Sequence, residues 1–117
     1  MSRPPNILWI CSDQQRVDTL GCYGNTHTHT QNIDRLAASG VSFDHVYCQS
    51  PICTPSRSSF LTGRYPRTCR GRQNGADLPS GEQLVTKLLA EVGYHCGLVG
   101  KLHLRACHSD ACPDEEE

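Results

Sequence analysis

The sequence predicts an α/β protein with a mostly parallel central sheet flanked by helices. A continuous apolar run at residues 7–11 is typical of a strand buried on both faces of such a sheet. Helical patterns with one apolar face follow at residues 32–40 and 80–93, and they supply flanking helices. At 117 residues, the chain is at most one small domain with a modest core.

The first predicted strand ends in polar residues. Ser12 and Asp13 follow it directly, and open α/β sheets bind their ligands at the carboxyl ends of strands. Asp13 is therefore a candidate ligand-binding residue, although an aspartate here serves equally well to cap the next turn. Residues 21–30 have the composition of a loop, in which a solvated role for His27 and His29 is favoured over a metal site.

The next pattern predicts a short helix capped by Asn32 and closed by Gly40. Its apolar face is formed by Ile33, Leu36 and Ala37. Residues 41–48 then alternate in polarity, which indicates a strand or an extended approach to the following loop. Ser50 and Pro51 mark the end of this segment.

Residues 53–63 predict a second helix, with a cysteine at its amino end. Thr54 is a good N-cap, Pro55 suits the first helical position, and Gly63 can end the helix in a left-handed conformation. Cys53 would lie beside free N–H groups, where a bound anion or a reactive cysteine is favoured, and Arg57 adds a cation one turn later. A capped surface helix beside an ordinary cysteine fits the local pattern about equally well.

A third helix is predicted to begin at a capping box of Ser80 and Gln83 and to end at Gly93. Its apolar stripe consists of Leu84, Val85, Leu88, Leu89 and Val92. Residues 98–99 predict a short strand that delivers Lys101 and His103 to its carboxyl end. We therefore expect Asp13, Cys53 and the Lys101/His103 pair to meet at one edge of the sheet.

Charge is distributed unevenly along the chain. Five of the twelve carboxylates lie between Asp110 and Glu117, so the preceding residues carry eleven Lys and Arg against seven carboxylates, a net charge of +4. Residues 45–76 contain five arginines and no carboxylate, which suits an anionic substrate. Nucleic acid is not an expected partner, because aromatic residues are few and are not interleaved with the basic ones.

Cysteine usage and hydropathy bear on the cellular compartment. The eight cysteines contain no C-x-x-C pair, so reduced thiols are favoured over a disulfide scaffold or a zinc module. No apolar run approaches the length of a membrane span, so we expect no membrane association. The start of the chain leads straight into the first strand without a signal peptide, which predicts a cytoplasmic protein.

Four segments, in order, resemble conserved motifs of one enzyme family. The stretch C-T-P-S-R-S-S-F-L-T-G at 53–63 is similar to the sulfatase signature C-x-P-S-R with its later L-T-G. Residues 5–13 resemble the opening strand and metal-binding aspartate of sulfatases, and 30–37 resemble T-P-N-x-D-x-L-A with Gln31 in place of proline. Residues 100–103 resemble G-K-x-H. The chain is similar to the N-terminal fragment of a formylglycine-dependent (type I) sulfatase, which implies an alkaline-phosphatase-like fold.

The resemblance implies a role for each matched residue. Cys53 would be oxidised to formylglycine by a formylglycine-generating enzyme, and its hydrate would bind the metal and attack sulfur. Arg57 would hold the hydrate and the oxygens beside the metal. Lys101 would bind a sulfate oxygen, and His103 would bind the hydrate or substrate and assist proton transfer. The implied substrate is a sulfated small molecule or glycan.

The resemblance also implies a Ca²⁺ site, with Mg²⁺ or Mn²⁺ as alternatives. Asp13 and the modified Cys53 would be ligands. Gln14 stands where many sulfatases have a second aspartate, and its carbonyl can bind a hard cation without contributing charge. Further metal and sulfate ligands are not identifiable in this chain, so we expect the chain alone to bind metal poorly and to be inactive.

Two other function classes stay open at this point. A phosphonate or phosphate monoester hydrolase of the same superfamily can share the nucleophile motif, and a non-catalytic cysteine-rich protein that binds metal or takes part in redox chemistry is the bland alternative. In the domain organisation that we expect, residues 1–105 form the N-terminal part of a sulfatase catalytic domain. Residues 106–117 form an acidic, disordered end.

Overall fold

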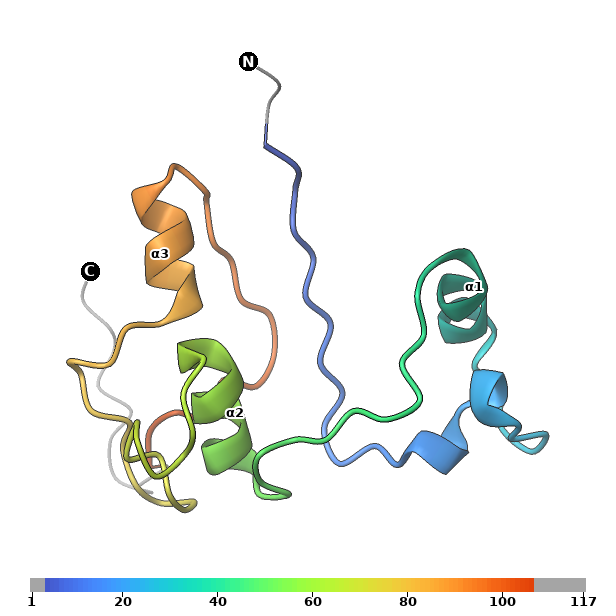
Figure 1. Cartoon of the computed structure of the whole chain (residues 1–117), viewed down its shortest axis with the longest axis horizontal. Helices are drawn as coiled ribbons and strands as arrows, with labels where there is room; N and C mark the ends of the chain where they lie inside the picture. Colours follow the sequence, from blue (N-terminus) through green and yellow to red (C-terminus); the bar gives the residue numbers. More distant parts are fainter. Residues whose placement is uncertain (1–3, 107–117) are drawn as a thin grey trace. The chain divides into compact units, whose positions relative to one another are not determined.

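The computed structural model describes residues 4–106 of the chain. The chain divides into two units, Met1–Val46 and Tyr47–Glu117. Their positions relative to one another are not determined, so each unit is described by itself (Figure 1). The acidic end expected at residues 106–117 lies outside the described residues, apart from Ala106.

The first unit contains two short 3-10 helices, η1 (Val17–Thr19) and η2 (Gly21–Tyr23), and the helix α1 (Gln31–Ser39). The Asp34 carboxylate joins α1 to η2, because its Oδ1 accepts the Cys22 N–H at 2.7 Å and the Thr30 hydroxyl at 3.0 Å. Gly21 lies so close that a Cβ atom there would be 2.6 Å from Asp34 Oδ2. A side chain at position 21 would therefore separate η2 from α1.

The capping prediction for α1 is wrong by two residues, because the helix begins at Gln31 with Thr30 as its N-cap. Asn32 instead accepts a hydrogen bond from the Arg35 guanidinium inside the helix. The Thr30 side chain makes no capping bond and accepts the Gly21 N–H at 2.7 Å. The predicted end is confirmed, since Gly40 is the C-cap.

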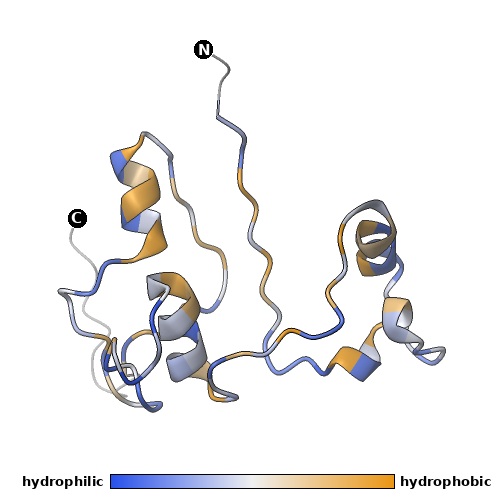
Figure 2. Cartoon of the chain, viewed as in Figure 1, coloured by the Kyte–Doolittle hydropathy of each residue, from blue (hydrophilic) through white to orange (hydrophobic). Residues whose placement is uncertain are grey.

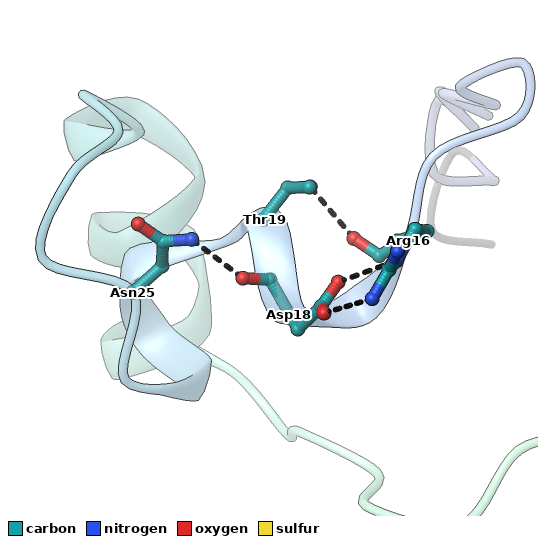
Figure 3. A network of polar contacts seen from close by, with 4 residues as sticks. All are labelled: Arg16, Asp18, Thr19 and Asn25. Atoms are coloured by element: carbon teal, nitrogen blue, oxygen red, sulfur yellow. Dashed lines mark hydrogen bonds and ion pairs between the residues drawn. The ribbon is translucent and has the colours of Figure 1, made fainter.

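A network of polar contacts orders η1 and the loop after it (Figure 3). The Arg16 guanidinium forks onto the Asp18 carboxylate, with Nε 3.0 Å from Oδ1, and this hydrogen bond and the charge attraction raise the pKa of Arg16. Asn25 donates to the Asp18 carbonyl oxygen at 2.6 Å, and its own Oδ1 accepts the His27 N–H at 2.8 Å. Side-chain bonds to the backbone therefore hold this loop.

The predicted strands are not formed within residues 4–106, where every regular element is a helix. The first apolar run is extended but exposed, with Leu8 84% and Ile10 77% accessible (Figure 2). Val99 is completely exposed. A strand exists only through a hydrogen-bonded ladder to a neighbouring strand, and no strand is present among residues 4–106 to form one. The mostly parallel central sheet is therefore not observed.

The second unit contains α2 (Cys53–Thr62) and α3 (Val85–Glu91), which contact each other (Figure 1). The capping box predicted for α3 is wrong, because Leu84 is the N-cap and no side chain caps the helix. The predicted end is confirmed by Gly93, which has a φ of 90° and donates its N–H to the Ala90 carbonyl oxygen at 2.9 Å. No helix among residues 4–106 has both the length and the apolar character needed to cross a membrane.

The buried residues of the second unit gather around α2. Thr54, Pro55 and Ser58 on this helix are fully buried, as is Cys69 in the loop that follows. Two longer connections close the unit. The Arg64 guanidinium binds the buried Glu82 carboxylate at 2.7 Å, and the Leu78 N–H donates to the Leu104 carbonyl oxygen at 2.8 Å. The helix that carries Cys53 is thus the best-packed element of the described chain.

Candidate active site

The amino end of α2 differs from its prediction. Cys53 is the first helical residue and Ile52 is the N-cap, so Thr54 lies inside the helix and Pro55 is the third residue. The Ser56 N–H makes the first bond of the helical ladder, to the Ile52 carbonyl oxygen at 3.0 Å. At the other end Gly63 has a φ of 67° and closes the helix in a left-handed conformation, as predicted.

Cys53 and Lys101, which are 48 residues apart, are brought together in the second unit. The Lys101 ammonium lies 3.4 Å from the Cys53 sulfur. Cys53 is half-buried and Lys101 is exposed, so solvent and a substrate can reach the pair. A positive charge therefore stands directly beside the first side chain of α2.

Arg57 holds the Lys101 segment against α2. Its guanidinium donates to the Lys101 carbonyl oxygen at 2.6 Å, and the residue is only 8% exposed. Because Arg57 follows Cys53 by about one helical turn, the same helix presents the cysteine and anchors the backbone that carries the lysine. The structure thus unites three of the predicted site residues, Cys53, Arg57 and Lys101.

His103 lies two residues beyond Lys101 in an unusual conformation. Its φ is 54°, a left-handed value that costs a residue other than glycine about 1–3 kcal/mol when the surroundings impose it. Its Nδ1 atom is buried and has no hydrogen-bond partner among the described residues. An orphaned buried nitrogen in a strained residue marks His103 as a candidate for binding a group from outside these residues.

The described residues do not form a complete metal site. Asp13 and Gln14 occupy an exposed bend in the first unit, with Gln14 at a φ of 53°. They belong to a different unit from Cys53, so the structure does not place them beside it. Among residues 4–106, no three His, Cys, Asp or Glu residues cluster as metal ligands would. Two side-chain oxygen donors fall short of the six to eight that Ca²⁺ takes, so these residues alone do not fit the ion.

The five arginines after residue 45 have different surroundings. Arg57 and Arg64 are engaged, with the Lys101 carbonyl and with Glu82. The other three are exposed, and their side chains make no hydrogen bond or ion pair to residues 4–106: Arg67, Arg70 and Arg72. The exposed arginines of this segment without an ion pair among residues 4–106 are therefore Arg67, Arg70 and Arg72, whereas Arg57 is buried.

One residue of this region was missed by sequence reasoning. Asn74 accepts the Thr54 N–H at 2.9 Å with its side-chain oxygen, although 20 residues separate the two. It lies in a polar, glycine-containing stretch that has no periodicity and resembles none of the four motifs. Asn next to Gly75, which has a φ of 79°, indicates a turn but not the helix that the turn contacts.

Comparison with known proteins agrees with the four motifs. The sulfatase family matches residues 5–114 of the chain. Human steryl-sulfatase is 42% identical over 90% of this chain and 20% of its own length. Human arylsulfatase A is 41% identical over 89% of this chain and 22% of its own, and human N-acetylgalactosamine-6-sulfatase is 38% identical over 87% and 22%. No solved structure matches.

These relatives are much longer than the chain, which spans about a fifth of their length. The family match nevertheless covers nearly all of the described residues, including Asp13, Cys53, Arg57, Lys101 and His103. The chain belongs to the sulfatase family.

Proposed function

We propose that residues 1–105 are the N-terminal part of a catalytic domain that hydrolyses sulfate esters. The observation that carries the proposal is the position of Lys101, whose ammonium lies 3.4 Å from the Cys53 sulfur at the start of α2. Attack on a sulfate ester requires a nucleophile and positive charge around the sulfate oxygens. Cys53 and Lys101 supply these two elements side by side.

Cys53 serves in this proposal as a precursor of formylglycine, which a formylglycine-generating enzyme would produce. The hydrated aldehyde would supply one hydroxyl that attacks sulfur and displaces the alcohol, and a second whose deprotonation would release sulfate and restore the aldehyde, whereas a thiol lacks the second group. The surroundings of Cys53 suit an oxygen at the sulfur position, because the Lys101 ammonium is a donor that binds oxygen strongly. The structure thus offers a cation to the modified side chain.

Arg57 and Lys101 divide the work of holding charge. Arg57 is buried and bonded to the Lys101 backbone, so it fixes the segment and adds a permanent positive charge behind residue 53. Lys101 is exposed, and its ammonium beside Cys53 would bind a sulfate oxygen in this proposal. In this arrangement the buried arginine orients the site and the exposed lysine binds the substrate.

His103 takes the part of a proton carrier. Its buried Nδ1 atom can accept a hydrogen bond or a proton from the substrate or from the hydrated residue 53. His103 comes two residues after Lys101, and its left-handed backbone sets the direction in which its ring leaves the chain.

The proposed site would bind Ca²⁺, with Mg²⁺ or Mn²⁺ as alternatives. Asp13, Gln14 and the modified Cys53 would be three of the ligands. The ion would add positive charge near the sulfate oxygens. Since residues 4–106 do not provide a complete ligand set, further donors from outside them are required.

The substrate is a sulfated small molecule or glycan. The names of the relatives include a steryl-sulfatase, arylsulfatases and an N-acetylgalactosamine-6-sulfatase, so members of the family differ in the alcohol that carries the sulfate. Lys101 binds the sulfate group in this proposal, and this contact does not discriminate between the alcohols.

Turnover of matched esters by the full-length protein, after co-expression with a formylglycine-generating enzyme, tests the proposal. We expect 4-nitrophenyl sulfate to be hydrolysed faster than 4-nitrophenyl phosphate, and the Cys53→Ala variant to lose at least about 100-fold in rate, as loss of a covalent nucleophile requires. Faster turnover of the phosphate would instead support a phosphate or phosphonate monoester hydrolase. Full activity of Cys53→Ala would contradict the proposed role of Cys53.

A further inference from the structure

The amino end of α2 lacks a capping residue of its own. A helix leaves its first backbone N–H groups unpaired, and a polar side chain at the N-cap normally accepts one of them. The N-cap of α2 is Ile52, whose side chain cannot accept a hydrogen bond. The first turn therefore needs an acceptor from elsewhere in the chain.

Few backbone N–H groups in the first turn of α2 require such an acceptor. Pro55 has no N–H, and the Ser56 N–H is already bonded to the Ile52 carbonyl oxygen. The turn also contains the Thr54 N–H. Asn74 Oδ1 accepts the Thr54 N–H at 2.9 Å, so the side chain of a distant residue performs the function of an N-cap.

The loop that carries Asn74 is fixed on both sides. On one side Gly71 lies against α2, where a Cβ atom would be 2.5 Å from the Ser58 Cβ. On the other side the Leu78 N–H donates to the Leu104 carbonyl oxygen, in the segment that carries Lys101 and His103. Asn74 thus lies in the loop between Gly71 and Leu78, which are both held in place, and its side chain links this loop to the start of α2.

We propose that Asn74 is a positioning residue of the site, which caps α2 at Thr54 and thereby holds Cys53 beside Lys101. Its importance for catalysis rests on the function proposed above, whereas the capping bond and its effect on Cys53 do not. Asn74 acts through the backbone of Thr54, and the reaction itself is assigned to other side chains.

Amide hydrogen exchange of the chain, followed by NMR at Thr54, tests the cap. Asn74→Ala removes the acceptor, and loss of an N-cap is expected to speed exchange at Thr54 about fivefold. Asn74→Asp supplies a carboxylate that accepts the same N–H and suits the positive end of the helix, so it should keep exchange near the wild-type rate. Gln73→Ala changes the exposed neighbouring residue and serves as the matched control.

A second measurement follows the position of Cys53 itself. Alkylation of Cys53 by anionic iodoacetate and by neutral iodoacetamide is quantified by peptide mass spectrometry, with exposed Cys96 as the internal reference. The rate ratio of the two reagents reports the positive charge near the sulfur. We expect Asn74→Ala to lower this ratio at Cys53 by about two- to fivefold, because the sulfur is no longer held beside Lys101, and Asn74→Asp to lower it less.

Each outcome bears on the proposal. Wild-type exchange at Thr54 in Asn74→Ala would overturn the cap, and an unchanged reagent ratio would overturn the positioning role. Equal acceleration of all α2 amides would also overturn it, because Asn74 would then serve the folding of the loop in general. Failure of the full-length, formylglycine-bearing protein to turn over sulfate esters, with both effects present, would refute the proposed function and leave the role of Asn74 intact.

Discussion

Gly71 offers the sharpest test of how α2 is held in place. An added Cβ atom would lie 2.3 Å from the Ser58 Oγ and 2.5 Å from the Ser58 Cβ, whereas carbon atoms in ordinary contact are about 3.5–4.0 Å apart. Ser58 is fully buried on α2 and cannot move aside. Gly71 does not have a positive φ, so the effect of a substitution comes from this contact and not from backbone strain.

We therefore expect Gly71→Ala to destabilise the packing of α2. Overpacking of this kind typically costs about 1–3 kcal/mol, which corresponds to an increase in the opening equilibrium of α2 of about 5- to 150-fold. Amide hydrogen exchange across α2, measured by NMR, reports this equilibrium directly. Gly81→Ala is the matched control, because an added Cβ at that position meets no atom within 4 Å.

A double-mutant cycle isolates the contact. Ser58→Gly removes the atoms that the new Cβ would meet, at a cost of about 0.5 kcal/mol in helix propensity relative to Ser. The double variant Gly71→Ala, Ser58→Gly should therefore lose less stability than the two single variants added together. Exchange in Gly71→Ala that equals exchange in Gly81→Ala would refute the reasoning, since it would show that the loop does not press on α2.

Three further predictions concern charge and metal. Lys101→Met should lower the ratio of iodoacetate to iodoacetamide alkylation at Cys53 about fivefold, the effect of about 1 kcal/mol from one nearby charge, whereas Lys87→Met should not change it. Arg64→Ala should lower the free energy of unfolding in urea by about 1–2 kcal/mol, because it leaves the buried carboxylate of Glu82 unpaired. The loss stays below that of a fully buried pair because Arg64 is half-exposed. Glu82→Gln should cost less than Arg64→Ala, and the reverse order would count against this ion pair. The 117-residue chain should bind Ca²⁺ with a Kd above about 1 mM by calorimetry and should not hydrolyse a generic aryl sulfate, so stoichiometric submillimolar binding or robust turnover would contradict the incomplete site.

The helices were predictable because their signals are local. Apolar patterns marked the helices within 32–40 and 80–93, end signals marked the helix at 53–63, and the glycines at 40, 63 and 93 marked where they end. The helix starts were predicted less well, because the groups that satisfy them are remote. Asn74 caps α2 from 20 residues away, and the side chain of Asn32 is used by Arg35 instead of the helix end.

The strands and the metal site depend on partners that a local pattern cannot supply. The apolar run at 7–11 matches a buried strand, but no strand is formed among residues 4–106 and the side chains of the run stay exposed. Asp13 was predicted to meet Cys53 at one edge of a sheet, and without that sheet the prediction stays untested. The approach of Lys101 to Cys53 was predicted from their motifs, and it is present because Arg57 bonds the Lys101 backbone to α2.

The central claim is that Cys53 is the precursor of the catalytic group. Its most direct test is mass spectrometry of the peptide that contains Cys53, after co-expression of the chain with a formylglycine-generating enzyme. We predict that the peptide loses its thiol sulfur and gains an aldehyde oxygen, while exposed Cys96 in the same chain keeps its thiol. Persistence of the free thiol at Cys53 under these conditions would contradict the account.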